Sequence, residues 1–296
     1  MNSLFQRASS RWVRYGEYEL KKGGDGRLYV TPTAEAAPKI YDPLKNAERI
    51  VLDALNVGLL CMDRAGEEKI RRAVMEFVSH YGLLGLMTAL PTTPYFMNYE
   101  AVYLPKNHFI KSGTMKARDY VALFFPFEKL DVRKEGKSAS WNMSDRMMAA
   151  LAMTMGDKPM AVNMSFQREY AERYDWLVRQ FKDWAFTFSA SFLYYEDYDE
   201  ADETTRELYR QGMAAFDGIA PTYHIALLDK PAIIWDFHSL LLCVQMMFSL
   251  MLTDGSKPLR ICKQCGRAFM ASRPSAVFCS PQCKNRYNVY KSRARD

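Results

Sequence analysis

The stretch "CKQCGRAFMASRPSAVFCSPQCKNRYNVYKSRARD" (residues 262–296) decides the fold of the last part of the chain. Its four cysteines form two pairs, Cys262 with Cys265 and Cys279 with Cys283, and thirteen residues separate the pairs. Four thiolates at this spacing can surround one Zn²⁺ as a tetrahedron. Because every ligand position is cysteine, no water would coordinate the metal, and we predict one structural Zn²⁺ rather than a catalytic centre.

The residues around the cysteines predict a definite local structure. Gly266 can adopt the positive φ that a turn after the first pair needs. Ser280 is a good N-cap and Pro281 suits the first helical position, so Cys283 would project from the first turn of a helix over residues 281–295. The positive end of that helix favours thiolates.

Between the two pairs, residues 266–278 are long enough for a short β-hairpin with "SRPS" (272–275) as its turn. In this arrangement Phe269 and Phe278 would pack on the metal site. A turn, a hairpin and a ligand-bearing helix together predict a treble-clef zinc finger.

This ending resembles the CGNR-type zinc finger, in which C-x2-C, a linker with arginine and C-x3-C-G-N-R lead into a basic helix. Asn285 and Arg286 match the N-R positions, whereas Lys284 stands where the family has glycine. The resemblance covers about 35 of 296 residues. It implies a bacterial transcription regulator that binds DNA through the finger. It also implies a larger N-terminal helical domain with a small-molecule or protein ligand.

The predicted helix has two different sides at 100° per residue. Cys283, Tyr287 and Tyr290 would face the metal. The outward side carries amide and basic residues, which could pair with base edges and contact phosphates. Three alternatives remain open: RNA binding, a protein partner held by Tyr287, Tyr290 and Phe269, and a basic helix that only closes the finger. The predicted nucleic-acid contacts are Lys284, Asn285, Arg286, Asn288, Lys291, Arg293 and Arg295.

Charge is unevenly distributed along the chain. Residues 257–296 hold ten Lys and Arg against one acid, whereas the preceding 256 residues hold 30 against 33. A basic tail on a slightly acidic body indicates a polyanionic partner, most often nucleic acid.

The longest apolar run, residues 240–252, is too short to span a membrane, so we predict a buried helix and no membrane partner. The first twenty residues lack a secretory leader pattern, so we expect a cytoplasmic protein whose thiols stay reduced.

The rest of the chain predicts a mainly α fold, with an α-rich domain over 1–255, a small N-terminal β-hairpin, and the zinc finger over 256–296. Glycines 23, 24 and 26 would form the hairpin tip. Asp42 and Pro43 begin a helix that runs to Met62. The other expected elements are helices near 66–82, 144–156, 165–197, 202–218 and 234–255, a strand at 223–229, and an irregular connection over 91–117.

No stretch predicts an enzyme. The four histidines form no metal-binding pair, and no nucleophile, base and oxyanion site can be assembled from the sequence. Cys61 and Cys243 lie in apolar runs and are expected to be core thiols.

Overall fold

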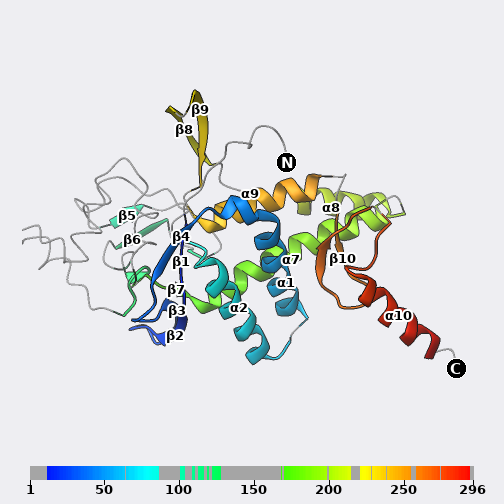
Figure 1. The fold of residues 1–296 in the computed structure, drawn as a ribbon, viewed down its shortest axis with the longest axis horizontal. Coiled ribbons are helices and arrows are strands. Elements are labelled where there is room, and N and C mark those ends of the chain that lie inside the picture. The colour runs from blue at the N-terminus through cyan, green and yellow to red at the C-terminus, as the bar shows by residue number, and fades with distance from the viewer. Residues whose placement is uncertain are drawn as a thin grey trace, which may run out of the picture.

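The computed structural model describes residues 12–63, 65–86, 101–103, 109–110, 113–116, 119, 122–127, 168, 170–198, 200–214, 221–227, 229–237, 239–254, 258–273 and 275–293. Helices form its body, and the strands make small antiparallel sheets around it (Figure 1). The strands are β1 (Trp12–Tyr15), β2 (Tyr18–Lys22), β3 (Leu28–Pro32), β4 (Pro38–Tyr41), β5 (Ala101–Tyr103), β6 (Thr114–Lys116), β7 (Glu172–Arg173), β8 (Thr222–Leu227), β9 (Pro231–Asp236), β10 (Leu259–Ile261) and β11 (Ala268–Met270). The helices are the 3-10 turn η2 (Pro43–Asn46), α1 (Ala47–Met62), α2 (Glu67–Tyr81), α7 (Tyr174–Asp197), α8 (Glu203–Ala214), α9 (Leu240–Thr253) and α10 (Pro281–Arg293).

Helices α1 and α7 pack face to face at the centre of the body (Figure 1). The predicted apolar stripe of α7 is confirmed, since Leu177, Phe181, Trp184 and Phe188 are all at most 1% exposed. Gly58 of α1 allows the close approach, because a Cβ there would lie 2.1 Å from the backbone oxygen of Phe181. This contact therefore requires the smallest residue at position 58.

The helix predicted over 165–197 is shorter in the structure, and it begins at Tyr174. The residues just before it leave the helix because Glu172 and Arg173 form β7, which pairs with β3. Glu172 is buried, and its carboxylate accepts the backbone N–H groups of Leu84 and Leu86 at 2.8 Å. A buried carboxylate needs such donors, so its hydrogen bonds override the helical pattern of the sequence.

The segment after α2 joins several distant elements. The indole Nε1 of Trp12 in β1 donates to the carbonyl of Leu83 at 2.8 Å, and the backbone N–H of Leu241 in α9 donates to the carbonyl of Leu84 at 2.7 Å. Together with the Glu172 bonds, these contacts fix α2 against β1, β7 and α9. Gly82 ends α2 as predicted, with φ of 87°.

The N-terminal strands are more numerous than predicted. The expected hairpin is present as β2 and β3, but β1 and β4 form a second antiparallel pair that local sequence did not indicate. The Asp42 cap is confirmed, since its side chain accepts the backbone N–H of Leu44, although the first turn is 3-10.

Three other predictions for the body concern α9, the segment 91–117 and a helix near 144–156. Helix α9 is apolar and buried as predicted, but it begins at Leu240 with Ser239 as its cap, because the residues before it belong to β9. Within the expected irregular segment 91–117, β5 and β6 pair as antiparallel strands. The helix expected near 144–156 lies outside the described residues.

The remaining expectations concern cysteines and membrane spans. Cys61 and Cys243 are buried thiols, as expected, and burial raises the pKa of Cys61 to about 11. Among the helices that the structure describes, none is both long and apolar enough to cross a lipid bilayer.

Candidate metal centre and the helix that follows it

The four predicted cysteines come together in one cluster at the C-terminal end of the chain. Their sulfur atoms all lie within 4.8 Å of one another. The Sγ of Cys279 is 3.7 Å from that of Cys265 and 3.5 Å from that of Cys283. A disulfide would need about 2.05 Å, so these are separate thiols. Zn–S bonds of about 2.3 Å in a tetrahedron place sulfurs about 3.8 Å apart, so the cluster fits Zn²⁺.

The first pair lies on a tight turn between β10 and β11. The N–H of Gly266 donates to the carbonyl of Cys262 at 2.9 Å, and Gly266 has the predicted positive φ of 68°. The N–H of Cys262 donates to the carbonyl of Arg267 at 2.9 Å. These bonds close the turn and direct both thiols to the same side.

The hairpin of the finger is not where the sequence predicted it. Strands β10 and β11 pair across the first cysteine pair, with Ile261 opposite Ala268, instead of forming a hairpin between the two pairs. The prediction was wrong because it ignored Leu259–Ile261, which precedes the first cysteine and supplies the partner strand. The segment just before the second cysteine pair is held instead by a backbone hydrogen bond, in which the N–H of Lys263 donates to the carbonyl of Val277 at 3.0 Å.

The second pair lies at the start of α10, as predicted. The hydroxyl of Ser280 accepts the N–H of Cys283 at 3.2 Å, and Pro281 is the first helical residue. The N–H of Cys279 points at the sulfur of Cys262 at 3.4 Å, which stabilises a thiolate there. Phe278, next to Cys279, packs on Tyr287 of α10, with ring centroids 5.1 Å apart.

The thiols differ in how readily they lose a proton. Burial alone would raise the pKa of Cys262, but the backbone N–H groups of Cys279, Cys265 and Gln264 outweigh it and lower that pKa to about 6. Burial and the neighbouring thiols raise the pKa of Cys279 to about 12. A metal cation would supply positive charge that lowers the pKa of Cys279 and favours its thiolate.

Asn56 of α1 attaches the finger to the body. Its Oδ1 accepts the backbone N–H of Ala268 at 2.8 Å, and its Nδ2 donates to the carbonyl of the same residue at 3.5 Å. The side chain thus pairs with the outer edge of β11 as a neighbouring strand would. Leu259 and Ala268 also belong to the buried apolar cluster of the body. Nothing in the sequence near Asn56 signalled this role.

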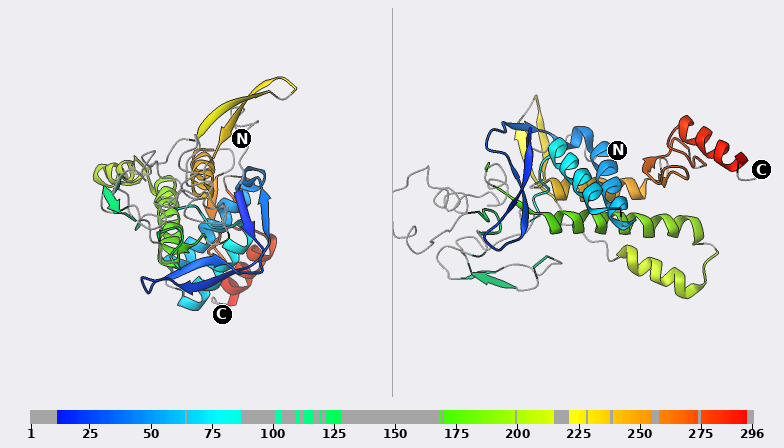
Figure 2. Two further views of the ribbon diagram at one scale, coloured as in Figure 1. Left: turned by 90° about the vertical axis from the view of Figure 1, so that its left-hand side faces the viewer. Right: turned by 90° about the horizontal axis from the view of Figure 1, so that it is seen from below.

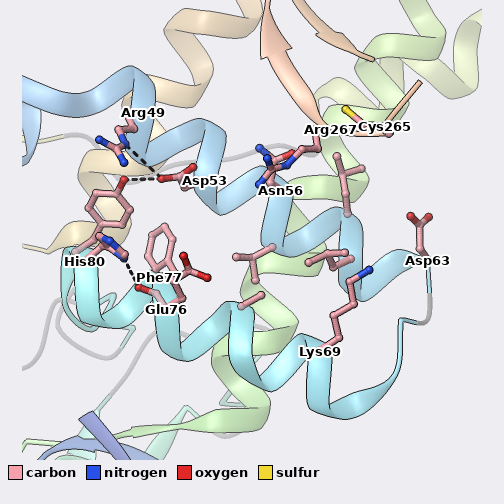
Figure 3. Close-up of a pocket in the computed structure, with 16 residues that line it drawn as sticks. Arg49, Asp53, Asn56, Asp63, Lys69, Glu76, Phe77, His80, Cys265 and Arg267 are labelled. Atoms are coloured by element: carbon pink, nitrogen blue, oxygen red, sulfur yellow. Dashed lines mark hydrogen bonds and ion pairs between the residues drawn. The ribbon is translucent and has the colours of Figure 1, made fainter. Parts of the chain in front are cut away.

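A cleft of about 530 Å³ lies beside this attachment, between α1, α2 and the cysteine turn (Figure 3). Figure 3 shows Arg49 and Asp53 on α1 near Phe77 and His80 of α2, whereas Asn56 lies toward the finger, next to Arg267. The hydroxyl of Tyr81 donates to Asp53 at 2.6 Å, and Arg49 lies 3.8 Å from the same carboxylate. The cleft is therefore bordered by charged side chains of α1 at one end and by the turn that carries Cys265 at the other.

The outward side of α10 is where the sequence predicted it. Lys284, Asn285, Arg286, Asn288, Lys291 and Arg293 are exposed, whereas Arg295 lies outside the described residues. Cys283 and Tyr287 face the cluster and are half-buried. Tyr290 does not pack there: it is 61% exposed, because the small hairpin ends before this turn of the helix.

No family model, curated protein or solved structure matches this chain.

Proposed function

We propose that the chain is a transcription regulator that binds nucleic acid, with duplex DNA as the preferred partner, through α10 mounted on a treble-clef zinc finger of the CGNR type. One observation carries the proposal: the described basic and amide side chains of α10 are all exposed. Among the described residues, none of the cations on α10 has an acid within ion-pairing distance. Such cations are available to phosphates.

The position of α10 supports this proposal. The helix has no buried residue, and it extends away from the body in Figure 1 and in the right-hand view of Figure 2. An isolated helix of about 10–12 Å diameter fits the major groove of B-DNA, which is about 12 Å wide. Asn285 and Asn288 could then pair with adenine edges while Lys284 and Lys291 contact phosphates.

Zinc has a structural role in this proposal. One Zn²⁺, held by Cys262, Cys265, Cys279 and Cys283, would tie the start of α10 to the β10–β11 hairpin. The hairpin is attached to α1 by Asn56. The helix would thus be presented in a fixed orientation, which lowers the ordering cost of binding.

A second candidate function is supported by a different observation. Val289 and Tyr290 are 48% and 61% exposed, and they are adjacent on α10. Exposed tyrosine is common at protein interfaces, so these residues could anchor a protein partner.

The resemblance also implies a ligand for the N-terminal domain, and we propose the cleft beside Asn56 for it, since about 530 Å³ is within the size range of small-molecule sites.

The test is the affinity of the zinc-loaded chain for a random pool of duplex DNA at several salt concentrations. Affinity should fall steeply with salt, because bound phosphates release counterions. Lys291→Ala should weaken binding and reduce the salt slope by about one, without loss of zinc. Lys39→Ala, at an exposed lysine of β4, is the matched control.

Salt-independent or undetectable binding would reject nucleic acid as the partner. Tighter binding to single-stranded RNA than to the duplex would replace DNA with RNA. Equal effects of Lys291→Ala and Lys39→Ala would reject α10 as the binding surface. A chelator-treated sample completes the design, because it should lose binding if the finger must be folded.

A further inference from the structure

A two-stranded arm, β8 and β9, stands out from the body. It lies well away from α10 in the three views of Figures 1 and 2. The register pairs Tyr223 with Trp235 and Leu227 with Pro231. Trp235 packs against the body core and forms a ring contact with Tyr223, with centroids 5.6 Å apart. The arm is therefore attached at this pair, and its other end points into solvent.

One face of the arm carries an exposed apolar stripe. Tyr223, Ile225 and Leu227 alternate along β8, so their side chains lie on the same face of the ribbon. They are 63%, 73% and 81% exposed, and exposure rises with distance from the base of the arm. Their cross-strand positions on β9, which are Trp235, Ile233 and Pro231, are also apolar residues. The face is thus apolar on both strands.

An arm whose apolar face stays exposed to water is unfavourable in free energy. A single two-stranded hairpin is marginally stable in water, and an exposed apolar strand is prone to pair with another chain. By contrast, the apolar side chains of β1 are covered, since Trp12, Val13 and Tyr15 are buried. The exposed stripe is therefore a surface that gains free energy when something covers it.

We propose that a second copy of this chain covers the stripe, so that the protein forms a twofold dimer through the faces of two β8–β9 arms. A twofold axis near Ile225 would place Tyr223 of one copy against Leu227 of the other. The stripe itself has no charge, so two copies can meet on it without repulsion. The same surface on both copies then forms the interface, as twofold symmetry requires.

The area of the stripe is consistent with a reversible dimer. A large apolar side chain presents on the order of 200 Å² when fully exposed, so three residues that are 63%, 73% and 81% exposed offer roughly 400 Å² per copy. A stable interface buries about 800 Å² per partner, so β8 supplies roughly half of the need. The opposite position on β9, Pro231, is also exposed and adds to this area, so the interface is at the small end of the range for specific complexes. The dimer should therefore dissociate on dilution.

The charges of the arm argue against a lipid surface as the cover. The segment 222–236 contains Asp229 and Asp236 but a single lysine, Lys230. Peripheral attachment to anionic lipids normally uses clusters of Lys and Arg beside the apolar residues. The arm also leaves the body at a different place from α10, so a dimer joined by the arms leaves both basic helices accessible.

The experiment is sedimentation of the zinc-loaded full chain over a range of concentrations from about 1 to about 100 µM, the affinity range of weak specific interfaces. We expect a reversible monomer–dimer equilibrium. Leu227→Asp should raise the dissociation constant at least tenfold, because two buried carboxylates would face apolar groups. His224→Asp places the same charge on the opposite face of β8 and is the matched control.

Ile225→Asp is a second variant, and thermal unfolding of each variant confirms that the body is folded. A wild type that remains monomeric at every concentration overturns the proposal, as does a dimer that Leu227→Asp and Ile225→Asp leave intact. Flotation with vesicles of phosphatidylserine and phosphatidylcholine tests the lipid alternative. Binding that Leu227→Asp abolishes would assign the stripe to membranes and reject the dimer. None of these results depends on nucleic-acid binding.

Discussion

Replacing Asn56 with leucine should loosen the finger without removing its metal. The change deletes the acceptor 2.8 Å from the backbone N–H of Ala268 and the donor to its carbonyl. Ala268 is 4% exposed, so its N–H would lose its partner in a nearly dry place. The lost bond contributes about 1 kcal/mol, and a buried donor without a partner costs about 1–3 kcal/mol.

Two cavities beside Asn56 reduce the summed cost of these two effects. Both are lined by Asn56 and Arg267, so water can reach the edge of β11 and satisfy part of the lost bonding. We therefore expect a cost of about 1–3 kcal/mol for detachment of the finger, which corresponds to local opening that is roughly 5-fold to 150-fold more frequent.

Hydrogen exchange measured by mass spectrometry on a peptide covering residues 259–270 reports that opening. Exchange should accelerate by the stated factor, while zinc content stays at one ion per chain. Asn46→Leu is the control, because Asn46 is exposed and makes no capping bond. If Asn56→Leu exchanges within twofold of the wild type, the amide of Asn56 does not hold the finger.

Three further predictions concern the body and the metal. Gly58→Ala should destabilise the body by about 1–3 kcal/mol in thermal unfolding, since the methyl meets the backbone of Phe181. Gly16→Ala, whose methyl meets no atom within 4 Å, is its control, and equal midpoints would contradict the packing argument. Cys283→Ala should abolish zinc binding and reduce helix content by circular dichroism, and a variant that keeps one zinc ion would show that another ligand set operates. Zinc affinity, measured by competition with a chelator, should rise from about pH 6 to about pH 8, because burial raises the pKa of Cys279 and zinc must displace its proton; a flat profile would refute this.

Local rules predicted much of the structure. Ser280 and Pro281 start α10 and Asp42 caps η2, because a cap depends only on residues two or three positions away. The apolar face of α7 and the burial of α9 follow from periodicity in the same way. The four thiols were predicted by spacing alone, and they do meet.

Features that depend on distant residues were missed. Strand β7 interrupts a helical pattern because Glu172 binds backbone groups almost ninety positions earlier. Strand β1 pairs with β4, and β10 pairs across the cysteine turn, for reasons that no local window contains. Tyr290 was placed on the metal side by helical phase, but the hairpin is too short to reach it. The role of Asn56 lies entirely in a contact 212 positions away.

The shared apolar cluster beneath β10 and β11 has a consequence for modularity. Leu259 and Ala268 are buried among side chains of the body, and Ile261 and Met270 pack against them. Residues 258–293 moved onto another protein would carry these side chains into water, and the edge of β11 would lack its amide partner. Under the proposed function, recognition should therefore change when outward residues of α10 are replaced, and it should not transfer with residues 258–293 alone.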